Sequence, residues 1–417
     1  MPVILRTDDR LAVTSAALGT ALATCYALAG PPGQPYDEPA HWSTVLFYAL
    51  RHRMPELGEP GSTYESQMGP AYYSPAGLLV EVLGVPGDRL GLYGLRLVGV
   101  LLVPLLAWLT HRLALAVHPD RGVAGFAVAA VSLSPLLLAI GGSIQNDYLA
   151  IVLATVALLQ GARVLRRPES PAWRHLVVGV LIGLAVLAKV VAVSLLAALL
   201  LTYAVQRGVS LRRRAGWAAA AVAGTALSCG WWFVRNLAVY GDLTGAARMA
   251  ESGYHFPPMR FSSLGEVQSW VSSLISYVFV PVEYYRNVFS TPAPLRLVAG
   301  VVTLAALGVL AAYVVRTVGA GRLGPALLDR PDRVLLVSAV VMAIAFYLAY
   351  SVLVWFIAAR LAFLTASAAA ILFGVASRDR AGDVVRVGVL GLYVAASVWL
   401  VLRASSVPAQ PYWIFPG

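Results

Sequence analysis

Residues 11–41 of the chain read LAVTSAALGTALATCYALAGPPGQPYDEPAH. The first part of this stretch, residues 11–29, is apolar and uncharged and has close to the roughly 20 residues that a helix needs to cross a bilayer. The motif Tyr36-Asp37-Glu38-Pro39-Ala40-His41 follows and places two carboxylates directly outside this span. A span with an acidic pair at its end predicts a membrane-embedded protein whose chemistry takes place at the membrane surface.

The composition extends this prediction to the whole chain. Of its 417 residues, 59% are hydrophobic and only 12% are charged, whereas a soluble domain has about 25% charged residues. Apolar stretches that could form spans begin near residues 11, 90, 122, 144, 175, 190, 215, 297, 334, 357 and 387. We therefore predict an all-α polytopic transmembrane protein of about eleven spans, folded as a single transmembrane domain over residues 1–417.

Membrane topology explains the net charge of +11. If the N-terminus is inside, 19 of the 31 Lys and Arg residues lie on the inner side, nearly all of them in short loops. The positive-inside rule then predicts a cytoplasmic N-terminus, an outer C-terminus and an odd number of spans. We expect a multi-pass protein of the inner (plasma) membrane, in contact with membrane lipids and without a nucleic-acid partner.

Two long segments, residues 30–89 and 235–295, interrupt the run of short loops, and both fall on the outer side. They are too polar and too rich in Pro and Gly to cross the bilayer, yet each contains a short apolar stretch, Ala76–Val85 and Val271–Val282. Stretches of this length favour interfacial helices over spans. We predict that the active site lies on the outer face and that its acids belong to the first long loop.

A carboxylate at the outer surface suits group transfer from a lipid-linked donor, because it can take a proton from an acceptor hydroxyl. Asp37 and Glu38 are the candidates. The alternative is a solvated pair, or one that orders the loop beside Arg51 or Arg53. His41 lies four residues after Asp37 and shares a helix face with it if the segment is helical. No cofactor is certain from the sequence, but this pair makes a divalent metal possible.

Asp147, at the end of the stretch Gly141-Gly142-Ser143-Ile144-Gln145-Asn146-Asp147, is a second candidate acid at the outer end of a later span. Its alternative role is to cap the following helix, where a carboxylate interacts favourably with the helix dipole. Arg96, about one turn into the second span, could pair with an acid of the first loop. No Asp or Glu lies in the middle of a predicted span, whereas ion-coupled transporters usually keep acids there.

Several motifs, in this order along the chain, resemble those of the GT-C superfamily of polytopic glycosyltransferases, and most closely the bacterial relatives of protein O-mannosyltransferases and of lipid A aminoarabinose transferase. They are Asp37-Glu38-Pro39-Ala40-His41, Glu65-Ser66-Gln67-Met68-Gly69-Pro70-Ala71-Tyr72-Tyr73, Ser143–Asp147, Trp231–Asp242 and Arg360-Leu361. Gln67-Met68-Gly69 departs from the commoner His/Gln-Pro-Pro form, and Leu361 replaces the usual Tyr. The resemblance covers about the first 250 residues well.

This resemblance implies transfer of a sugar, hexose or pentose and most simply mannose-like, from a polyprenyl-phosphate-linked donor to a hydroxyl of an exported acceptor, with inversion. The first-loop acid of the family, its general base, corresponds to Asp37, and Asp147 to a second acid that orients a substrate. The acceptor is open among protein Ser/Thr, glycan, lipid and secondary metabolite. A lipid-linked sugar flippase or transporter remains the alternative function, and a scaffold for envelope assembly is a third.

A polyprenyl phosphate leaving group needs cations at the outer membrane surface. Lys189, Arg235 and Arg360 are the candidates, although a snorkelling or anchoring role explains each of them as well. Lys189 is the only lysine of the chain. Possible substrate contacts are His41, Glu65, Tyr72, Tyr73, His255 and Arg260, for the last two of which an ordinary loop role is the alternative.

Overall fold

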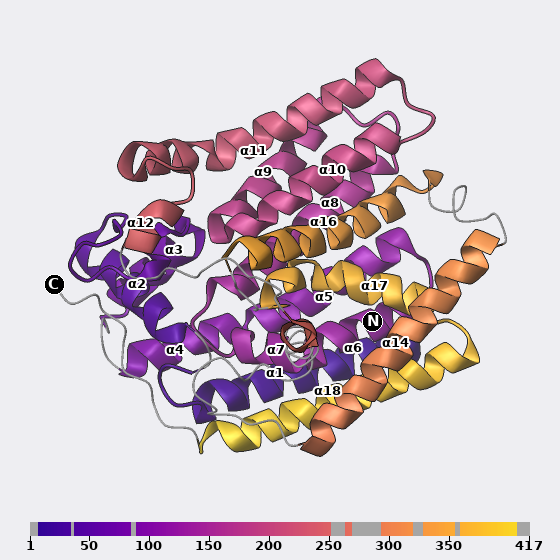
Figure 1. Cartoon of the computed structure of the whole chain (residues 1–417), viewed down its shortest axis with the longest axis horizontal. Helices are drawn as coiled ribbons and strands as arrows, with labels where there is room; N and C mark the ends of the chain where they lie inside the picture. The colour runs from indigo at the N-terminus through magenta and orange to yellow at the C-terminus, as the bar shows by residue number, and fades with distance from the viewer. Residues whose placement is uncertain are drawn as a thin grey trace, which may run out of the picture.

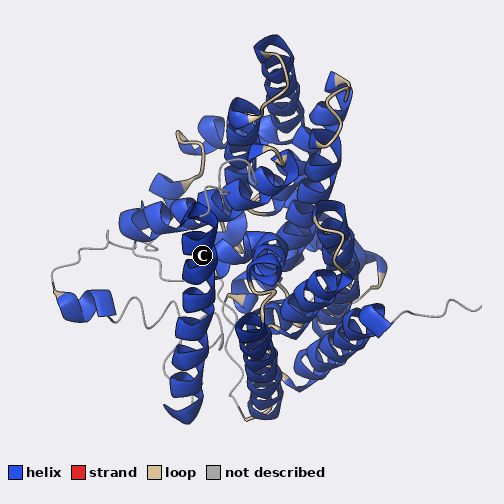
Figure 2. Ribbon diagram, turned by 90° about the vertical axis from the view of Figure 1, so that its right-hand side faces the viewer, coloured by secondary structure: helices blue, strands red, loops and turns tan. Residues whose placement is uncertain are grey.

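The computed structural model describes residues 7–34, 37–84, 89–251, 263–268, 293–319, 328–354 and 359–406. All regular secondary structure in these ranges is helical, as Figure 2 shows, which confirms the predicted all-α class. His255, Arg260 and the predicted interfacial stretch at 271–282 lie outside the described residues.

The helices follow one another along the chain with short connections. In the first half they are α1 (Thr7–Ala29), α2 (Glu38–Arg51), the 3-10 helix η1 (Tyr64–Gln67), α3 (Pro70–Val82), α4 (Arg89–Val100), α5 (Leu102–Val117), α6 (Arg121–Leu133), α7 (Pro135–Gly141), α8 (Asn146–Leu165) and α9 (Ala172–Ala188). Then come η2 (Val190–Ala192), α10 (Val193–Val205), α11 (Leu211–Tyr240), α12 (Ala246–Glu251), α14 (Ala293–Gly319), α16 (Pro331–Val354), η3 (Ala359–Thr365), α17 (Ala366–Ala376) and α18 (Arg380–Ala404).

A helix begins at or near each of the eleven positions predicted for a span, but the helices differ in length. Seven stretches of the described chain are long and apolar enough to cross a membrane, and the bent pair of α6 and α7 makes up to eight. α9, α10 and the helix that ends at Ala376 are apolar but shorter. The polytopic architecture is therefore confirmed, whereas the count of eleven spans stays a prediction.

α8, whose span is the most buried of those in the described chain, packs against α5, α9 and α16. α9 packs along α11, α1 along α6 and α10 along α16 (Figure 1). At one end of this bundle, α2, η1 and α3 form a small layer, which we call the cap (residues 38–82). Its own apolar cluster, which includes Trp42, Tyr73 and Leu92 of the neighbouring α4, fixes the cap on the bundle.

Two breaks in the helices bring side chains to the capped end. Pro135 starts α7 after a bend of 57° between α6 and α7, because a proline cannot continue the preceding helix. α7 then leads into the Gly142–Gln145 segment that precedes α8. Lys189 adopts an extended conformation, with φ −155° and ψ 122°, between α9 and η2. The chain thus places Asp147 and Lys189 beside each other at the ends of helices rather than within them.

Candidate active site

Asp37 lies at the junction between α1 and α2, buried beneath the cap, with 7% of its surface exposed. It occupies the N-cap position of α2, yet its side chain makes no capping hydrogen bond. Instead its carboxylate accepts a hydrogen bond from the Tyr64 hydroxyl (2.8 Å) and forms an ion pair with the Arg360 guanidinium. Arg360 comes from η3, more than 300 residues later, so the fold joins the first loop to the C-terminal helices at this carboxylate.

Asp147 and Lys189 form a second ion pair that touches the first. The Lys189 Nζ lies 2.6 Å from Asp147 Oδ1, and the Arg360 Nη1 lies 4.0 Å from Asp147 Oδ2. Lys189 also donates to the Asn146 side chain (3.3 Å), and Arg360 donates to the Gln145 side chain (3.3 Å). Two carboxylates and two cations thus alternate in one buried cluster. The N-cap position of α8 belongs to Gln145, whereas Asp147 lies in the first turn, where a carboxylate still interacts favourably with the helix dipole.

A third group of side chains lines the cap side of this cluster. The Tyr73 hydroxyl lies 2.7 Å from His41 Nδ1 and donates to Glu65 Oε2 at 3.2 Å. His41 Nε2 is buried and has no hydrogen-bond partner among the described residues. Gly69 allows this arrangement, because a Cβ at that position would lie 2.2 Å from the Leu187 carbonyl oxygen. The chain between Glu65 and Tyr73 can therefore approach the end of α9 closely.

Burial and neighbouring charges shift the pKa values of Asp37, Glu65 and His41 in different directions. Burial by itself would raise the pKa of Asp37, but Arg360 opposes this and, with Tyr64, holds the pKa below its usual range. Burial raises the pKa of Glu65 to about 7, and the nearby Asp37 carboxylate adds to this effect. Burial lowers the pKa of His41 to about 3, so its imidazole is neutral. Of these three groups, Asp37 is therefore an ionised carboxylate, Glu65 titrates near neutrality and His41 is a neutral imidazole.

Glu38 adjoins Asp37 in sequence, but its carboxylate makes its contacts outside this cluster. Its carboxylate accepts from Arg96 Nε (2.8 Å) and from the backbone N–H groups of Gly33 and Ile144 (both 2.9 Å). Arg96 in turn donates to four backbone carbonyls between Ala27 and Gln34. This fully buried pair ties the end of α1 to the start of α2 and to the segment before α8, which supports a positioning role for Glu38 rather than a chemical one.

Arg235 does not join the cations around Asp37. Its guanidinium donates to the Pro55 carbonyl (2.9 Å) and to the Tyr240 hydroxyl (3.3 Å), while the Leu57 N–H also bonds to Tyr240. This anchors the C-terminal part of α11 to the first loop. Tyr72 packs edge-on against Tyr73, with ring centroids 5.4 Å apart, and its hydroxyl also hydrogen-bonds to the backbone of Gln145.

Three of the site residues could hold a divalent cation. Asp37, His41 and Glu65 are all buried, and one ligand atom of each lies within 4.8 Å of the others. The neutral imidazole and the unpartnered Nε2 fit a metal ligand. A cation there would have to share Asp37 with Arg360, which already neutralises that carboxylate.

Tyr64, Gln145 and Asn146 were not predicted as site residues, although each contacts a charged group of the cluster. Each adjoins a residue or lies within a motif that had been singled out. Their contacts cross from one helix to another, so neighbouring sequence carried no signal for the partner.

Comparison with known structures shows the same arrangement of helices in other membrane proteins. The crystal structure of ArnT from Cupriavidus metallidurans bound to undecaprenyl phosphate has the same fold, with a TM-score of 0.59 at 14% identity over 94% of this chain and 75% of that one. ArnT in the apo state gives 0.54 at 15% identity, with the same coverage. The chain therefore has the fold of the GT-C glycosyltransferases, as its motifs predicted.

More specifically, residues 81–232 match the family model of dolichyl-phosphate-mannose-protein mannosyltransferase. A further structural match is the archaeal oligosaccharyltransferase AglB from Archaeoglobus fulgidus, in complex with an inhibitory peptide and a dolichol-phosphate. It has a TM-score of 0.54 at 13% identity, and the match covers 96% of this chain but only 56% of AglB. No curated protein sequence matches the chain.

Proposed function

We propose that the chain is a membrane glycosyltransferase that moves one sugar, mannose-like, from a polyprenyl-phosphate-linked donor to a hydroxyl of an exported acceptor. The observation that carries this proposal is the buried cluster in which Asp37 meets Arg360, and Arg360 meets the Asp147–Lys189 pair. A proton acceptor and two cations are the groups that this reaction requires. The matched ArnT structure, which is bound to undecaprenyl phosphate, supports a donor of the same chemistry.

Each group has a role in the proposed step. The Asp37 carboxylate takes the proton of the acceptor hydroxyl while the oxygen of that hydroxyl forms a bond to the anomeric carbon of the sugar. The bond between that carbon and the phosphate oxygen breaks, and the configuration inverts because attack and departure occur on opposite faces. The electron pair leaves with the polyprenyl phosphate, whose new negative charge Arg360 and Lys189 stabilise. Asp147 holds Lys189 in position.

An apolar pocket of about 330 Å³ supports a lipid-linked donor. It begins at Ala362 and Phe363 of η3, the helix that carries Arg360, and continues between α6, α14, α16 and α18. An isoprenoid chain that lies in this pocket would lead its phosphate towards Arg360. The proposed donor site thus combines a cation and an apolar pocket that share the helix η3.

Replacement of Asp37 by Asn tests the assignment of the base. The amide keeps the shape of the side chain but cannot accept the proton, so we expect transfer to fall by at least about a thousandfold while the protein still inserts. The measurement is product formation from polyprenyl-phosphate mannose in proteoliposomes, followed by mass spectrometry. Glu59→Gln, in an acid of the same loop outside the cluster, is the control. Unchanged turnover in Asp37→Asn contradicts the assignment.

The same proteoliposomes distinguish the flippase or transporter alternative. A transferase gives a glycosylated product that depends on Asp37, whether or not the labelled lipid moves between leaflets. Translocation of the lipid without product, for a panel of hydroxyl acceptors, contradicts the proposed transfer.

A further inference from the structure

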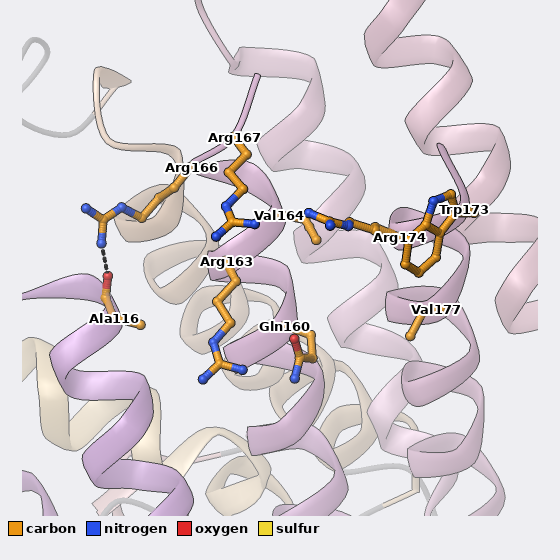
Figure 3. Close-up of a pocket in the computed structure, with 9 residues that line it drawn as sticks. All are labelled: Ala116, Gln160, Arg163, Val164, Arg166, Arg167, Trp173, Arg174 and Val177. Atoms are coloured by element: carbon orange, nitrogen blue, oxygen red, sulfur yellow. Dashed lines mark hydrogen bonds between the residues drawn. The ribbon is translucent and has the colours of Figure 1, made fainter. Parts of the chain in front are cut away.

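A second pocket, of about 610 Å³, lies at the end of the bundle opposite the candidate active site. α8 starts at Asn146, beside the site, and ends 20 residues later at the pocket, a length of roughly 30 Å for a helix. α9 returns from the pocket to Lys189. The arginine distribution predicts that this end is cytoplasmic. Figure 3 shows the pocket between the ends of α5, α8 and α9.

Four arginines line this pocket and none of them forms an ion pair with a carboxylate of the described chain. They are Arg163, Arg166, Arg167 and Arg174. Arg166 donates to the Ala116 carbonyl, and the acid nearest in sequence, Glu169, pairs instead with Arg213 at 3.5 Å. The positive-inside rule explains why arginines are frequent at this end, but it does not require four of them to line one cavity. Guanidinium groups that share a cavity form a site for phosphate oxygens, which they bind with two parallel hydrogen bonds.

The rim of the pocket is apolar and exposed on the outside of the bundle. Trp173 is 60% exposed and Val177 is 41% exposed, and the Arg174 guanidinium lies 5.4 Å from the centre of the Trp173 ring. Tryptophan is enriched where a membrane protein meets the boundary between headgroups and hydrocarbon. Cations inside the pocket and apolar groups at its rim match the two halves of a phospholipid better than they match a soluble anion.

We infer that this pocket binds the phosphate headgroup of an anionic membrane lipid, with the acyl chains against the Trp173 side of α9. Basic pockets between spans on the cytoplasmic side bind such headgroups through the same combination of charge and depth. This site is separate from the proposed transfer reaction and does not depend on it.

Native mass spectrometry of the purified chain with phosphatidylglycerol, cardiolipin or phosphatidylcholine tests this inference. The pocket variant is Arg163→Gln/Arg167→Gln/Arg174→Gln, which leaves the Arg166 contact intact. The matched control is Arg10→Gln/Arg207→Gln/Arg380→Gln, which removes the same charge from exposed positions outside the pocket. We expect the wild type and the control to retain the two anionic lipids, and the pocket variant to bind them at least about tenfold more weakly.

The single variant Arg174→Gln, compared with Arg207→Gln, gives the test if the triple variant does not fold, with an expected loss of about fivefold. Equal loss in the pocket and control variants contradicts the inference, because it attributes binding to net charge alone. Equal retention of phosphatidylcholine also contradicts it. A third arm adds inorganic phosphate at millimolar concentration. If inorganic phosphate displaces the lipid and binds the pocket with an affinity similar to that of the lipid, the pocket is a site for a soluble anion and the lipid assignment is overturned.

Discussion

Arg360 binds the carboxylate that we propose as the base, and this contact bears on how the base becomes active. The guanidinium neutralises Asp37 and holds the pKa of that carboxyl low, which makes it a weak proton acceptor. A donor phosphate offers Arg360 a more highly charged partner. When Arg360 turns towards it, the pKa of Asp37 rises and its carboxylate becomes a stronger base. We therefore propose that donor binding activates Asp37 through this shared arginine.

Arg360→Gln tests the role of Arg360 in the proposed transfer step. Loss of the guanidinium removes a group that stabilises the leaving phosphate, so we expect kcat to fall about 100- to 1,000-fold. Arg360→Lys retains the charge without the planar fork and should recover part of the loss. Arg53→Gln, in the exposed pair with Glu59, is the control and should leave turnover within about twofold. Equal effects of Arg360→Gln and Arg53→Gln would contradict the role of Arg360.

Glu65 predicts a pH dependence of stability. Its pKa rises from 4.5 in the unfolded chain to about 7 when folded, so the native protein holds a proton that the unfolded chain has lost between these values. The contribution of Glu65 to stability therefore falls as the pH rises from about 4.5 to about 7, by at most about 3 kcal/mol, while the lowered pKa of His41 contributes in the opposite direction up to about pH 6.5. Glu65→Gln cannot ionise, so the stability of the wild type relative to this variant should fall as the pH rises through this range.

The measurement is the Tm in detergent at each pH between 5 and 8, with unfolding monitored by tryptophan fluorescence. Glu59→Gln is the matched control, because the pKa of Glu59 is lowered and it titrates below this window. Parallel profiles for the wild type and Glu65→Gln would show that Glu65 is ionised throughout.

The separate residues of the site could be predicted from the sequence better than their partners could. Asp37, Asp147, Lys189 and Arg360 stood out because charged groups beside apolar spans are costly, and the structure brings these four together. The sequence analysis grouped Glu38 with Asp37, since they are adjacent. Although they are adjacent at the start of α2, the Asp37 carboxylate pairs with Arg360 and the Glu38 carboxylate pairs with Arg96. Spacing along the sequence does not reveal these different partners.

At the scale of the elements, the positions of the helices could be predicted but not how far each one crosses. Length and hydrophobicity determine where an apolar helix begins, and α9 and α10 appear where two short stretches were expected. The helical conformation is interrupted between them at Lys189, whose backbone is extended and whose side chain pairs with Asp147. Whether such half-length helices cross the bilayer depends on their neighbours, which hydropathy does not describe.

The contact between α9 and α11 makes a prediction about helix packing. A Cβ at Gly179 would lie 2.0 Å from the Ala221 carbonyl oxygen, and one at Gly224 would lie 2.1 Å from the Leu176 carbonyl oxygen. Gly179 and Gly183 are four residues apart, the spacing of small residues that lets helices approach closely in membranes. Gly224→Ala should force the two helices apart and destabilise the protein by about 1–3 kcal/mol.

Gly216→Ala is the matched control for Gly224→Ala, because it lies on the same helix and a Cβ there meets no atom within 4 Å. It should leave the Tm unchanged or raise it slightly, since alanine favours the helix. A lower Tm for Gly224→Ala alone supports close packing. The same Tm for both variants would mean that α9 and α11 have room to adjust.

At the scale of the whole molecule, the two ends of the bundle differ in chemistry. The capped end holds buried, paired charges around Asp37, whereas the other end carries the arginines of the short loops and the four that line the second pocket. If the cap faces outwards, the proposed transfer takes place where exported acceptors are found, and the arginines lie where the positive-inside rule predicts them. The reverse orientation would place both sets of groups on the unfavourable side.

This orientation predicts the labelling of single cysteines. Cys25 and Cys229 are the two cysteines of the chain and can be replaced by serine to give a background without thiols. Glu56→Cys, in the exposed part of the first loop, should react with a membrane-impermeant maleimide in intact bacterial cells, because that loop faces outwards. Arg207→Cys, between α10 and α11 at the opposite end, should react only after lysis. The reverse pattern would place Asp37 on the cytoplasmic side, where an exported acceptor could not reach it, and would contradict the proposed function together with the orientation.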